Sequence, residues 1–206
     1  AFTSPHDPRN QLPAYGQKYS PETLGLPANF LPQHPFDNGE MDVRDELLVP
    51  APRTGGQVQK ELADYYGMIS EVDVQIGRVL QTLKETGQAD NTIIVFASDN
   101  GLAVGRHGLL GKQNLYDHSV KVPLTLIAPN YKAQKGKKNR ALCYLHDIAP
   151  TLCELAYIPL PESMTAQSLS QILDEFAAIH RSDLFLAYSN SQRAFVNEHH
   201  TYIIYN

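Results

Sequence analysis

The sequence has few cysteines, no long hydrophobic run and no excess of basic residues. Its two cysteines, Cys143 and Cys153, stand in apolar surroundings without the spacing of a zinc site or a disulfide framework, so both are predicted to be unreactive core residues. No apolar stretch reaches the roughly 18 residues of a membrane span. The opening residues do not resemble a signal peptide. The formal net charge of -5 offers no basic face for the phosphates of a nucleic acid. We therefore expect neither a membrane nor a nucleic acid as a partner.

The overall composition is typical of a globular protein. Hydrophobic residues form 42% of the 206 residues and charged residues 19%, which excludes an intrinsically disordered chain and a coiled coil. The length allows one large domain or two small ones.

Prolines are concentrated in the first quarter of the chain, where residues 1–52 hold nine of the 14. Because proline interrupts helices and central strands, residues 1–56 are predicted to form an extended loop region. A long irregular stretch in a compact protein is usually functional. The chain opens on Ala1 and Phe2 and breaks at once into a polar turn, which indicates a start in the middle of a strand.

A long amphipathic helix is predicted over residues 57–86. Apolar residues recur there at spacings of three and four and trace one helix face, and Gly87 is a natural C-terminal stop. The β-branched run 91–97 and the proline-bracketed run 122–129 are each typical of a strand buried on both faces. A helix followed by such a strand indicates a layered α/β sheet.

The last part of the chain predicts short elements. Residues 132–140 are rich in lysine and indicate a solvated basic loop rather than a phosphate site, since no aromatic residue accompanies the charges. Asp147 is predicted to cap a short helix that ends near residue 156, and another short helix is expected over 168–178. Residues 193–196 and 201–205 are predicted to pair as a hairpin.

The segment Ser98-Asp99-Asn100-Gly101 follows directly on the first predicted strand. In an open α/β sheet ligands bind beyond the carboxyl ends of the strands, so site residues are expected here. The side-chain oxygens of Asp99 and Asn100 are the hard donors that Ca²⁺ and Mg²⁺ prefer. The same segment also has the composition of an ordinary turn, in which glycine accepts a positive φ.

Two further segments contain candidate catalytic residues. The stretch 105–112 places His107 and Lys112 among three glycines, which suits either an oxyanion-binding loop with Lys112 as its cation or an exposed surface loop. His6 lies in a proline-rich turn that either aims its imidazole at the site as a proton donor or has only a structural role. No supporting context surrounds the histidines at positions 118, 146, 180, 199 and 200.

These segments, taken in order, resemble the sulfatase family of the alkaline phosphatase superfamily. Residues 4–8 resemble its Pro-His-x-Pro segment, residues 65–78 its long helix, and residues 92–101 its strand followed by Ser-Asp-(Asn/His)-Gly. Residues 105–124 resemble the stretch that holds the family's sulfate-binding lysine, and residues 147–152 its Asp-x-x-Pro-Thr-Leu helix start. Several motifs in one order are more specific than any one of them alone.

The resemblance implies an α/β fold of two parts. Residues 1–150 would form part of an alkaline-phosphatase-like three-layer αβα sandwich, with 1–56 as its proline-rich loop region. Residues 151–206 would form an incomplete small α+β subdomain with an antiparallel hairpin.

The resemblance also implies the roles of five residues. Asp99 and Asn100 would bind a divalent cation, usually Ca²⁺ and alternatively Mg²⁺. His6 and Lys112 would contact the sulfate or its bridging oxygen, and His6 would protonate the leaving alcohol. His107 would belong to the wall on the substrate side. A structural role or a place on the pocket rim would fall to Asp117, His118 and Lys121.

The chain lacks the family's nucleophile motif. In the family a formylglycine is made from the Cys or Ser of a Cys/Ser-x-Pro-x-Arg motif in the N-terminal half, and no cysteine or serine of this sequence stands in such a motif. The chain is therefore expected to correspond to the C-terminal half of a sulfatase. It is also expected to be inactive alone, because it has no nucleophile and an incomplete set of metal ligands. It should not hold Ca²⁺ tightly, because it supplies two oxygen ligands where a hard cation such as Ca²⁺ takes six to eight.

The function implied by the resemblance is hydrolysis of sulfate esters. Residues 29–32 and 36–40 resemble segments of bacterial sulfatases that act on carbohydrates, so a sulfated carbohydrate or small molecule is the expected substrate. The alternatives are a phosphodiester or phosphonate hydrolase of the same superfamily and a non-catalytic module that binds sulfated glycans. The resemblance also suggests a periplasmic or secreted protein, and it leaves the oligomeric state open.

Overall fold

The computed structural model describes residues 2–129, 131, 136–174 and 179–206, and it divides into two compact units. The first unit comprises Ala1–Gln88 and Asn100–Lys121, and the second comprises Ala89–Asp99 and Val122–Asn206. The backbone thus changes unit between Asp99 and Asn100, the two predicted metal ligands. The predicted domain boundary at residue 150 stays a prediction.

The first unit is built on one long helix, α3, which spans Gly55–Glu85. Thr54 caps its N-terminus: the Thr54 hydroxyl accepts a hydrogen bond from the backbone N–H of Gln57 (3.3 Å), and the Gln57 side chain accepts one from the backbone N–H of Thr54 (2.8 Å). The helix gives way to Gly87, whose φ is +70°. The helix predicted over 57–86 is confirmed, with a slightly earlier start.

Only the first half of α3 packs into a core. Val58 and Leu62 are buried against Val104 of a following loop, and the helix residues that are buried are Val58, Leu62, Ala63, Gly67 and Met68. Farther along the same apolar stripe, Val79 is 61% exposed. The periodicity of the sequence therefore predicts the helix correctly, but it does not tell which turns are covered.

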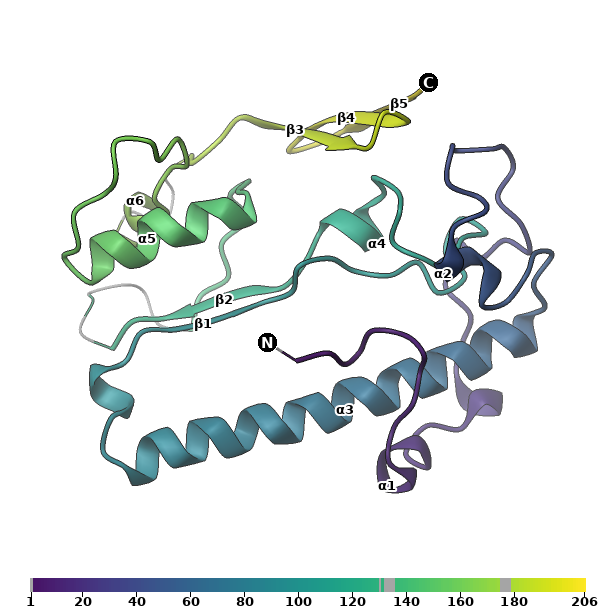
Figure 1. Ribbon diagram of the computed structural model, residues 1–206, viewed down its shortest axis with the longest axis horizontal. Coiled ribbons are helices and arrows are strands. Elements are labelled where there is room, and N and C mark those ends of the chain that lie inside the picture. The colour runs from purple at the N-terminus through teal and green to yellow at the C-terminus, as the bar shows by residue number, and fades with distance from the viewer. Residues whose placement is uncertain (1, 130, 132–135, 175–178) are drawn as a thin grey trace. The chain divides into compact units, whose positions relative to one another are not determined.

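The N-terminal region lies along α3 and contains only short helices in its described part. The helices α1 and η1 contact α3 (Figure 1). Across this contact Gln11 Nε2 donates to Asp64 Oδ1 (3.0 Å), and the hydroxyls of Tyr19 and Ser70 are hydrogen-bonded (2.8 Å). The short helices are α1 (Pro13–Gly16), the 3-10 helix η1 (Pro21–Thr23) and α2 (Arg44–Leu47). A proline-rich region without long helices is what the sequence predicts.

The second unit contains two small antiparallel sheets, drawn in teal and in yellow-green in Figure 1. The first pairs β1 (Ile94–Ala97) with β2 (Leu124–Ile127), and the 3-10 helix η2 (Ala89–Asn91) precedes it. The second sheet has the order β3-β4-β5, made of Asp183–Tyr188, Gln192–Asn197 and Thr201–Tyr205. The predicted hairpin is therefore confirmed as β4 and β5, whereas β3 was not predicted.

Short helices connect the two sheets of the second unit. They are the 3-10 helix η3 (Leu145–Asp147), α5 (Ile148–Leu155) and α6 (Ser170–Asp174). The predicted helix near residues 150–156 and the start of the one expected over 168–178 are thus present. Residues 175–178 and 132–135 lie outside the described residues. The rest of the predicted basic loop, 136–140, is exposed.

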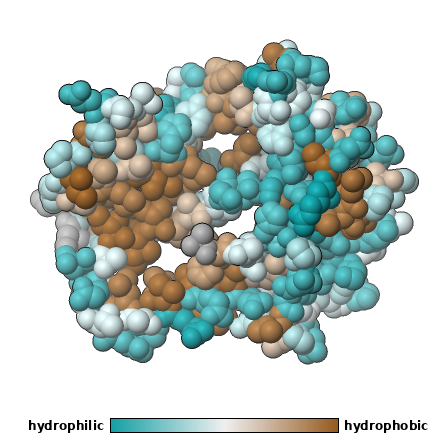
Figure 2. Space-filling model, in the orientation of Figure 1, coloured by the Kyte–Doolittle hydropathy of each residue, from teal (hydrophilic) through white to brown (hydrophobic). Residues whose placement is uncertain are grey.

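The strands β1 and β2 are not buried on both faces, contrary to the prediction. Phe96 is 45% exposed and Ile127 is 47% exposed. Figure 2 shows an apolar surface over this part of the chain. A ribbon of only two strands leaves such side chains uncovered, because the described residues of this unit do not supply a layer for each face.

Asp147 stands at the N-cap position of α5, but its side chain does not cap that helix, so the predicted cap is wrong. Its buried carboxylate instead accepts hydrogen bonds from the backbone N–H of Gln167 (3.0 Å), from the backbone N–H of Tyr144 (2.9 Å) and from Arg181 Nη2 (2.7 Å). Burial alone would raise the pKa of Asp147, but these donors outweigh burial and lower it. The carboxylate therefore links three segments.

Both cysteines are free and only partly buried, so their prediction as core residues is wrong. Burial, together with the nearby Asp147 carboxylate, raises the pKa of the Cys143 thiol. A thiol with a raised pKa is a poor nucleophile, which agrees with the predicted lack of reactivity.

Among the described residues, no helix is both long and apolar enough to cross a membrane.

Candidate active site

The structure brings His6 and Lys112 into direct contact within the first unit. The Lys112 ammonium nitrogen lies 2.9 Å from His6 Nε2. An ammonium group has donors only, so Nε2 is the acceptor and the ring proton of a neutral His6 resides on Nδ1. On that side, Nδ1 lies 2.8 Å from the backbone oxygen of Asp7 and 3.2 Å from its Oδ1. Asp7 therefore fixes both the orientation and the tautomer of the imidazole.

Two carboxylates and two cations form an ion-pair cluster beneath this contact. Arg44 Nη1 lies 2.6 Å from Asp7 Oδ2 and 3.7 Å from Asp45 Oδ1. Asp45 Oδ2 lies 3.9 Å from Lys112 Nζ and accepts a hydrogen bond from Gln113 Nε2 (3.0 Å). Asp7 and Asp45 are buried, whereas the His6 side chain is 45% exposed. The imidazole of His6 is thus partly exposed to solvent, and the two carboxylates beneath it are buried.

A buried ion pair holds the loop that presents Lys112. The Glu46 carboxylate accepts the backbone N–H groups of Leu110 (3.0 Å) and Gly111 (2.8 Å). Glu46 is paired with Arg53 at 2.8 Å, and Arg53 Nη1 also donates to the Gly108 carbonyl (2.8 Å). The two side chains are 5% and 2% exposed, so these bonds are shielded from water. The loop from residue 108 to 111 is therefore fixed from one side by two charges.

Glycine is required in this loop for space. A Cβ atom on Gly108 would come within 2.2 Å of the Gln33 backbone, and φ at Gly108 is +73°. Two other loop residues, Val104 (φ 43°) and His107 (φ 54°), also take the left-handed conformation although they carry side chains. Such backbone strain clusters at ligand sites. The glycine-rich stretch 105–112 is thus a tightly folded, partly buried hairpin. It is not an exposed surface loop, which was the alternative to an oxyanion-binding loop.

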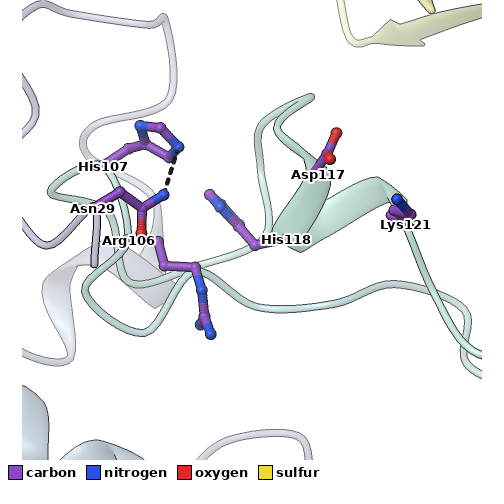
Figure 3. A pocket seen from close by; sticks show the side chains of 6 residues that line it. All are labelled: Asn29, Arg106, His107, Asp117, His118 and Lys121. Atoms are coloured by element: carbon purple, nitrogen blue, oxygen red, sulfur yellow. Dashed lines mark hydrogen bonds between the residues drawn. The ribbon is translucent and has the colours of Figure 1, made fainter. Parts of the chain in front are cut away.

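A pocket of about 310 Å³ lies beside His107 in the first unit (Figure 3). Its lining residues are Asn29, Arg106, His107, Asp117, His118 and Lys121. His118 belongs to α4, which spans Asp117–Val120, and its ring points toward Arg106 and Asn29. His107 is stacked on Tyr116 with ring centroids 4.3 Å apart, and its ring lies 5.8 Å from that of His118. Within the described residues no hydrogen bond or ring contact joins His107 to His6 or Lys112.

Both imidazoles of the pocket are held in the neutral form. Burial lowers the pKa of His107, and the nearby His34 adds to this effect. Burial also lowers the pKa of His118, to about 3, with further contributions from His107, Arg106 and His34. Neutral imidazoles offer one donor and one acceptor each. The charges of this pocket therefore come from Arg106, Lys121 and Asp117.

Asp99 and Asn100 follow β1 as consecutive residues, at the change between the two units. The Asn100 amide nitrogen donates to the Gly101 carbonyl (2.9 Å), which sets the orientation of the amide. The Gly101 N–H donates to the Ser119 carbonyl (2.9 Å), and a Cβ at Gly101 would come within 2.0 Å of the His118 carbonyl oxygen. One carboxylate and one amide oxygen fit a hard cation in kind. Among the described residues, no group of three or more His, Cys, Asp or Glu side chains is placed to hold a metal.

Several residues around the site were missed by sequence reasoning. Arg44, Asp45, Glu46 and Arg53 lie in the proline-rich region, where no spacing marks a charged residue as buried. Their association with Lys112 arises only when residues 44–53 fold against residues 108–113. For His118 the residues alone gave no context, but the resemblance assigned it, with Asp117 and Lys121, to structure or to the pocket rim. All three line the pocket.

The family model named Sulfatase matches residues 1–158, more than half of the chain. The chain therefore belongs to the sulfatase family, as its ordered motifs indicate.

Two relatives and one solved structure illustrate the similarity. An arylsulfatase of Clostridium perfringens is 30% identical over 208 residues, which are 99% of this chain and 42% of that protein. An N-acetylglucosamine-6-O-sulfatase of Bacteroides thetaiotaomicron is 36% identical over 56% of this chain and 21% of its own length. The phosphonate monoester hydrolase SpPMH of Silicibacter pomeroyi superimposes with a TM-score of 0.81 at 25% identity, over 98% of this chain and 46% of that one. The chain thus spans less than half the length of each of these three proteins.

Proposed function

We propose that this chain forms one side of the active site of a sulfuric ester hydrolase that acts on sulfated carbohydrates. The observation that carries the proposal is the 2.9 Å contact between Lys112 and His6, in a chain of the sulfatase family. A mobile cation beside an imidazole that can carry a proton is the pair of groups that hydrolysis of an ester of a tetrahedral oxyanion needs. The N-acetylglucosamine-6-O-sulfatase among the relatives supports a carbohydrate ester as the substrate.

In the proposed mechanism Lys112 turns from His6 to the sulfate and neutralises one of its oxygens. This contact strengthens as negative charge grows on those oxygens in the transition state. Once Lys112 has turned away, His6 takes up a proton from water on Nε2 and becomes positively charged. It gives this proton to the bridging oxygen when the nucleophile attacks sulfur and the S–O bond breaks, so that the product leaves as an alcohol. Asp7 stabilises the positively charged imidazole through Nδ1. His107 has a place on the wall that faces the rest of the substrate.

Two parts of the machinery need groups that this chain does not supply. Asp99 and Asn100 would contribute two oxygen ligands to a Ca²⁺ or Mg²⁺ ion. Because Ca²⁺ takes six to eight oxygen ligands, further ligands would have to come from elsewhere. The ion, when bound, neutralises charge on the sulfate oxygens. The nucleophile, a formylglycine in this family, is proposed to come from a portion of the protein outside these residues.

The phosphonate monoester hydrolase is the second candidate, because the solved SpPMH superimposes over 98% of the chain. The two candidates differ in the central atom of the ester and not in the roles of Lys112 and His6. Substrate preference is therefore the property that separates them.

The test uses the full-length protein that contains this chain. Release of sulfate is measured with N-acetylglucosamine-6-O-sulfate and with 4-nitrophenyl sulfate. Release of 4-nitrophenol is measured with 4-nitrophenyl phenylphosphonate. The proposal predicts a higher kcat/KM for the sulfate esters. A preference for the phosphonate ester would support the second candidate, and binding of sulfated sugar without any turnover would indicate a non-catalytic module.

A further inference from the structure

The pocket beside His107 has a chemical character that the ester site does not explain. Its two cations, Arg106 and Lys121, take part in no ion pair within the described part of the chain, whereas six other lysine and arginine side chains there pair with a carboxylate. Figure 3 shows the two cations on opposite sides of His118. Asp117 supplies the single negative charge of the lining, so the pocket carries a net positive charge.

The neutral groups of the pocket suit a sugar. Asn29 Nδ2 lies 2.9 Å from His107 Nε2, and because an amide nitrogen only donates, His107 accepts there and has its proton on Nδ1. His118 Nε2 is buried and has no hydrogen-bond partner among the described residues. A buried nitrogen without a partner is costly unless a ligand or water satisfies it. Two neutral imidazoles and an amide are donors and acceptors matched to hydroxyl groups.

The size and the backbone of the pocket point to a small ligand. A volume of about 310 Å³ is at the lower end of the range for small-molecule sites, which suits one monosaccharide unit rather than a chain of them. His107, in the left-handed conformation, carries the ring that lines the pocket, and Tyr116 stacks behind that ring at an interplanar angle of 9°. This places a rigid aromatic wall along one side.

The pocket is built on the turn that contains the candidate metal ligand Asn100. Gly101, the next residue, donates its N–H to Ser119 of α4, and it leaves no room for a side chain against His118. The short helix that carries His118 and Asp117 is thereby fixed to this turn. A ligand in the pocket would therefore lie next to the backbone that follows Asn100.

From these observations we propose that the pocket binds the sugar unit of the substrate, and that Arg106 and Lys121 select a sugar with a second acidic group besides the ester that is cleaved. The ligand class is thus an acidic monosaccharide, with either a carboxylate or a second sulfate. This inference rests on the proposed hydrolysis of carbohydrate sulfate esters, whose substrate it narrows. Charge-assisted hydrogen bonds to Arg106 would give the acidic sugar its advantage.

The experiment is a calorimetric titration of the full-length protein with two matched pairs of sugars. The pairs are glucosamine-2-N-sulfate with N-acetylglucosamine, and glucuronic acid with glucose. We expect at least one acidic sugar to bind about 10- to 100-fold more tightly than its neutral partner, the size of one charge-assisted contact. The pair that shows the difference identifies the acid as a sulfate or a carboxylate.

Variants of the two cations test whether the preference for the acidic sugar arises in this pocket. Arg106→Gln should abolish it, and Lys121→Gln should weaken it. Arg78→Gln, at an exposed arginine of α3, should leave it intact. Lys112→Ala should also leave it intact, because an acid bound at the ester site would instead lose affinity in that variant.

Equal binding of acidic and neutral sugars, or a preference that survives Arg106→Gln, would overturn the inference. Because the titration needs no turnover, these outcomes are independent of whether the protein hydrolyses sulfate esters. A protein that binds acidic sugars in this pocket and hydrolyses no sulfate ester would contradict the proposed function while leaving the binding preference in place.

Discussion

Lys112 Nζ lies 2.9 Å from His6 Nε2, although the two residues are 106 positions apart in the sequence. The contact depends on two loops of the first unit, a proline-rich turn around His6 and a glycine-rich hairpin that ends at Lys112. Asp7 orients the histidine, and Asp45 together with the Glu46–Arg53 pair holds the lysine and its loop. The two nitrogens are therefore held in place by buried charged side chains.

Lys112→Ala removes the cation proposed to bind the sulfate. We expect kcat for sulfate release by the full-length protein to fall by about 10²–10³, as when one oxyanion donor is lost. Lys60→Ala is the matched control, because Lys60 is exposed on α3 and pairs with Asp64 at 2.7 Å. An unchanged rate in Lys112→Ala would remove this residue from the site.

His6→Gln removes the proposed proton donor. With a sugar sulfate, whose leaving alcohol needs a proton, the rate should fall by about 10²–10⁴, the usual contribution of general acid catalysis. With 4-nitrophenyl sulfate the loss should be much smaller, because 4-nitrophenolate leaves without protonation. The assay compares kcat/KM for both esters in the variant and the parent protein. Equal losses on the two substrates would argue against an acid role for His6.

Glu46→Gln leaves Arg53 buried without a counter-charge. Breaking such a buried pair costs about 3–5 kcal/mol of folding free energy, and the variant should also loosen the backbone at Leu110 and Gly111. Urea unfolding measures the first effect, and amide hydrogen exchange at these two residues measures the second. The control is Glu85→Gln on the exposed end of α3, where a change below about 0.5 kcal/mol is expected. Unaltered exchange at residues 110 and 111 would show that Glu46 does not hold this loop.

His118 makes stability depend on pH. Its pKa is lowered in the folded state to about 3, so between pH 6.5 and 3 the unfolded chain binds more protons than the folded chain. The stabilisation is present in full above pH 6.5 and is lost as the pH falls toward 3, by up to about 1.4 kcal/mol for each pH unit. Urea unfolding at pH 7 and pH 5 should therefore show a smaller pH effect in His118→Gln than in the parent protein. His199→Gln, at a side chain that is 75% exposed, should behave like the parent. A pH effect of the same size in His118→Gln would refute this assignment.

Asp99→Ala tests the proposed cation site. A chelator should abolish sulfate release by the full-length parent protein, and added Ca²⁺ should restore it. In Asp99→Ala the restored rate should be far lower or need much more Ca²⁺, because a carboxylate ligand is missing. Ca²⁺ dependence that is the same in variant and parent would exclude Asp99 as a ligand.

The long helix and the ordered motifs were predictable from the sequence because they rest on local patterns. The apolar period of α3 and the stop at Gly87 each depend on residues that are close together in the sequence. The family could likewise be inferred from short segments in a fixed order. Strand β3 was missed because its alternation of buried and exposed residues depends on its pairing with β4.

The partners of the candidate site were not predictable, because they are set by tertiary contacts. Glu46 and Arg53 look like ordinary loop charges until residues 108–111 fold onto them. Asp147 has the position of a helix cap, yet donors from distant segments occupy its oxygens. The burial of β1 and β2 was overestimated, since an apolar run indicates what a strand can bury and not what is present to cover it.

The most direct measurement of the central claim is the rate of sulfate release by the full-length protein with Lys112→Ala, His6→Gln and both changes together. Residues that act on one ester as a unit have strongly non-additive effects. We predict that the double variant loses little more activity than the more severe of the two single variants. Losses that multiply would contradict the claim that Lys112 and His6 form one site.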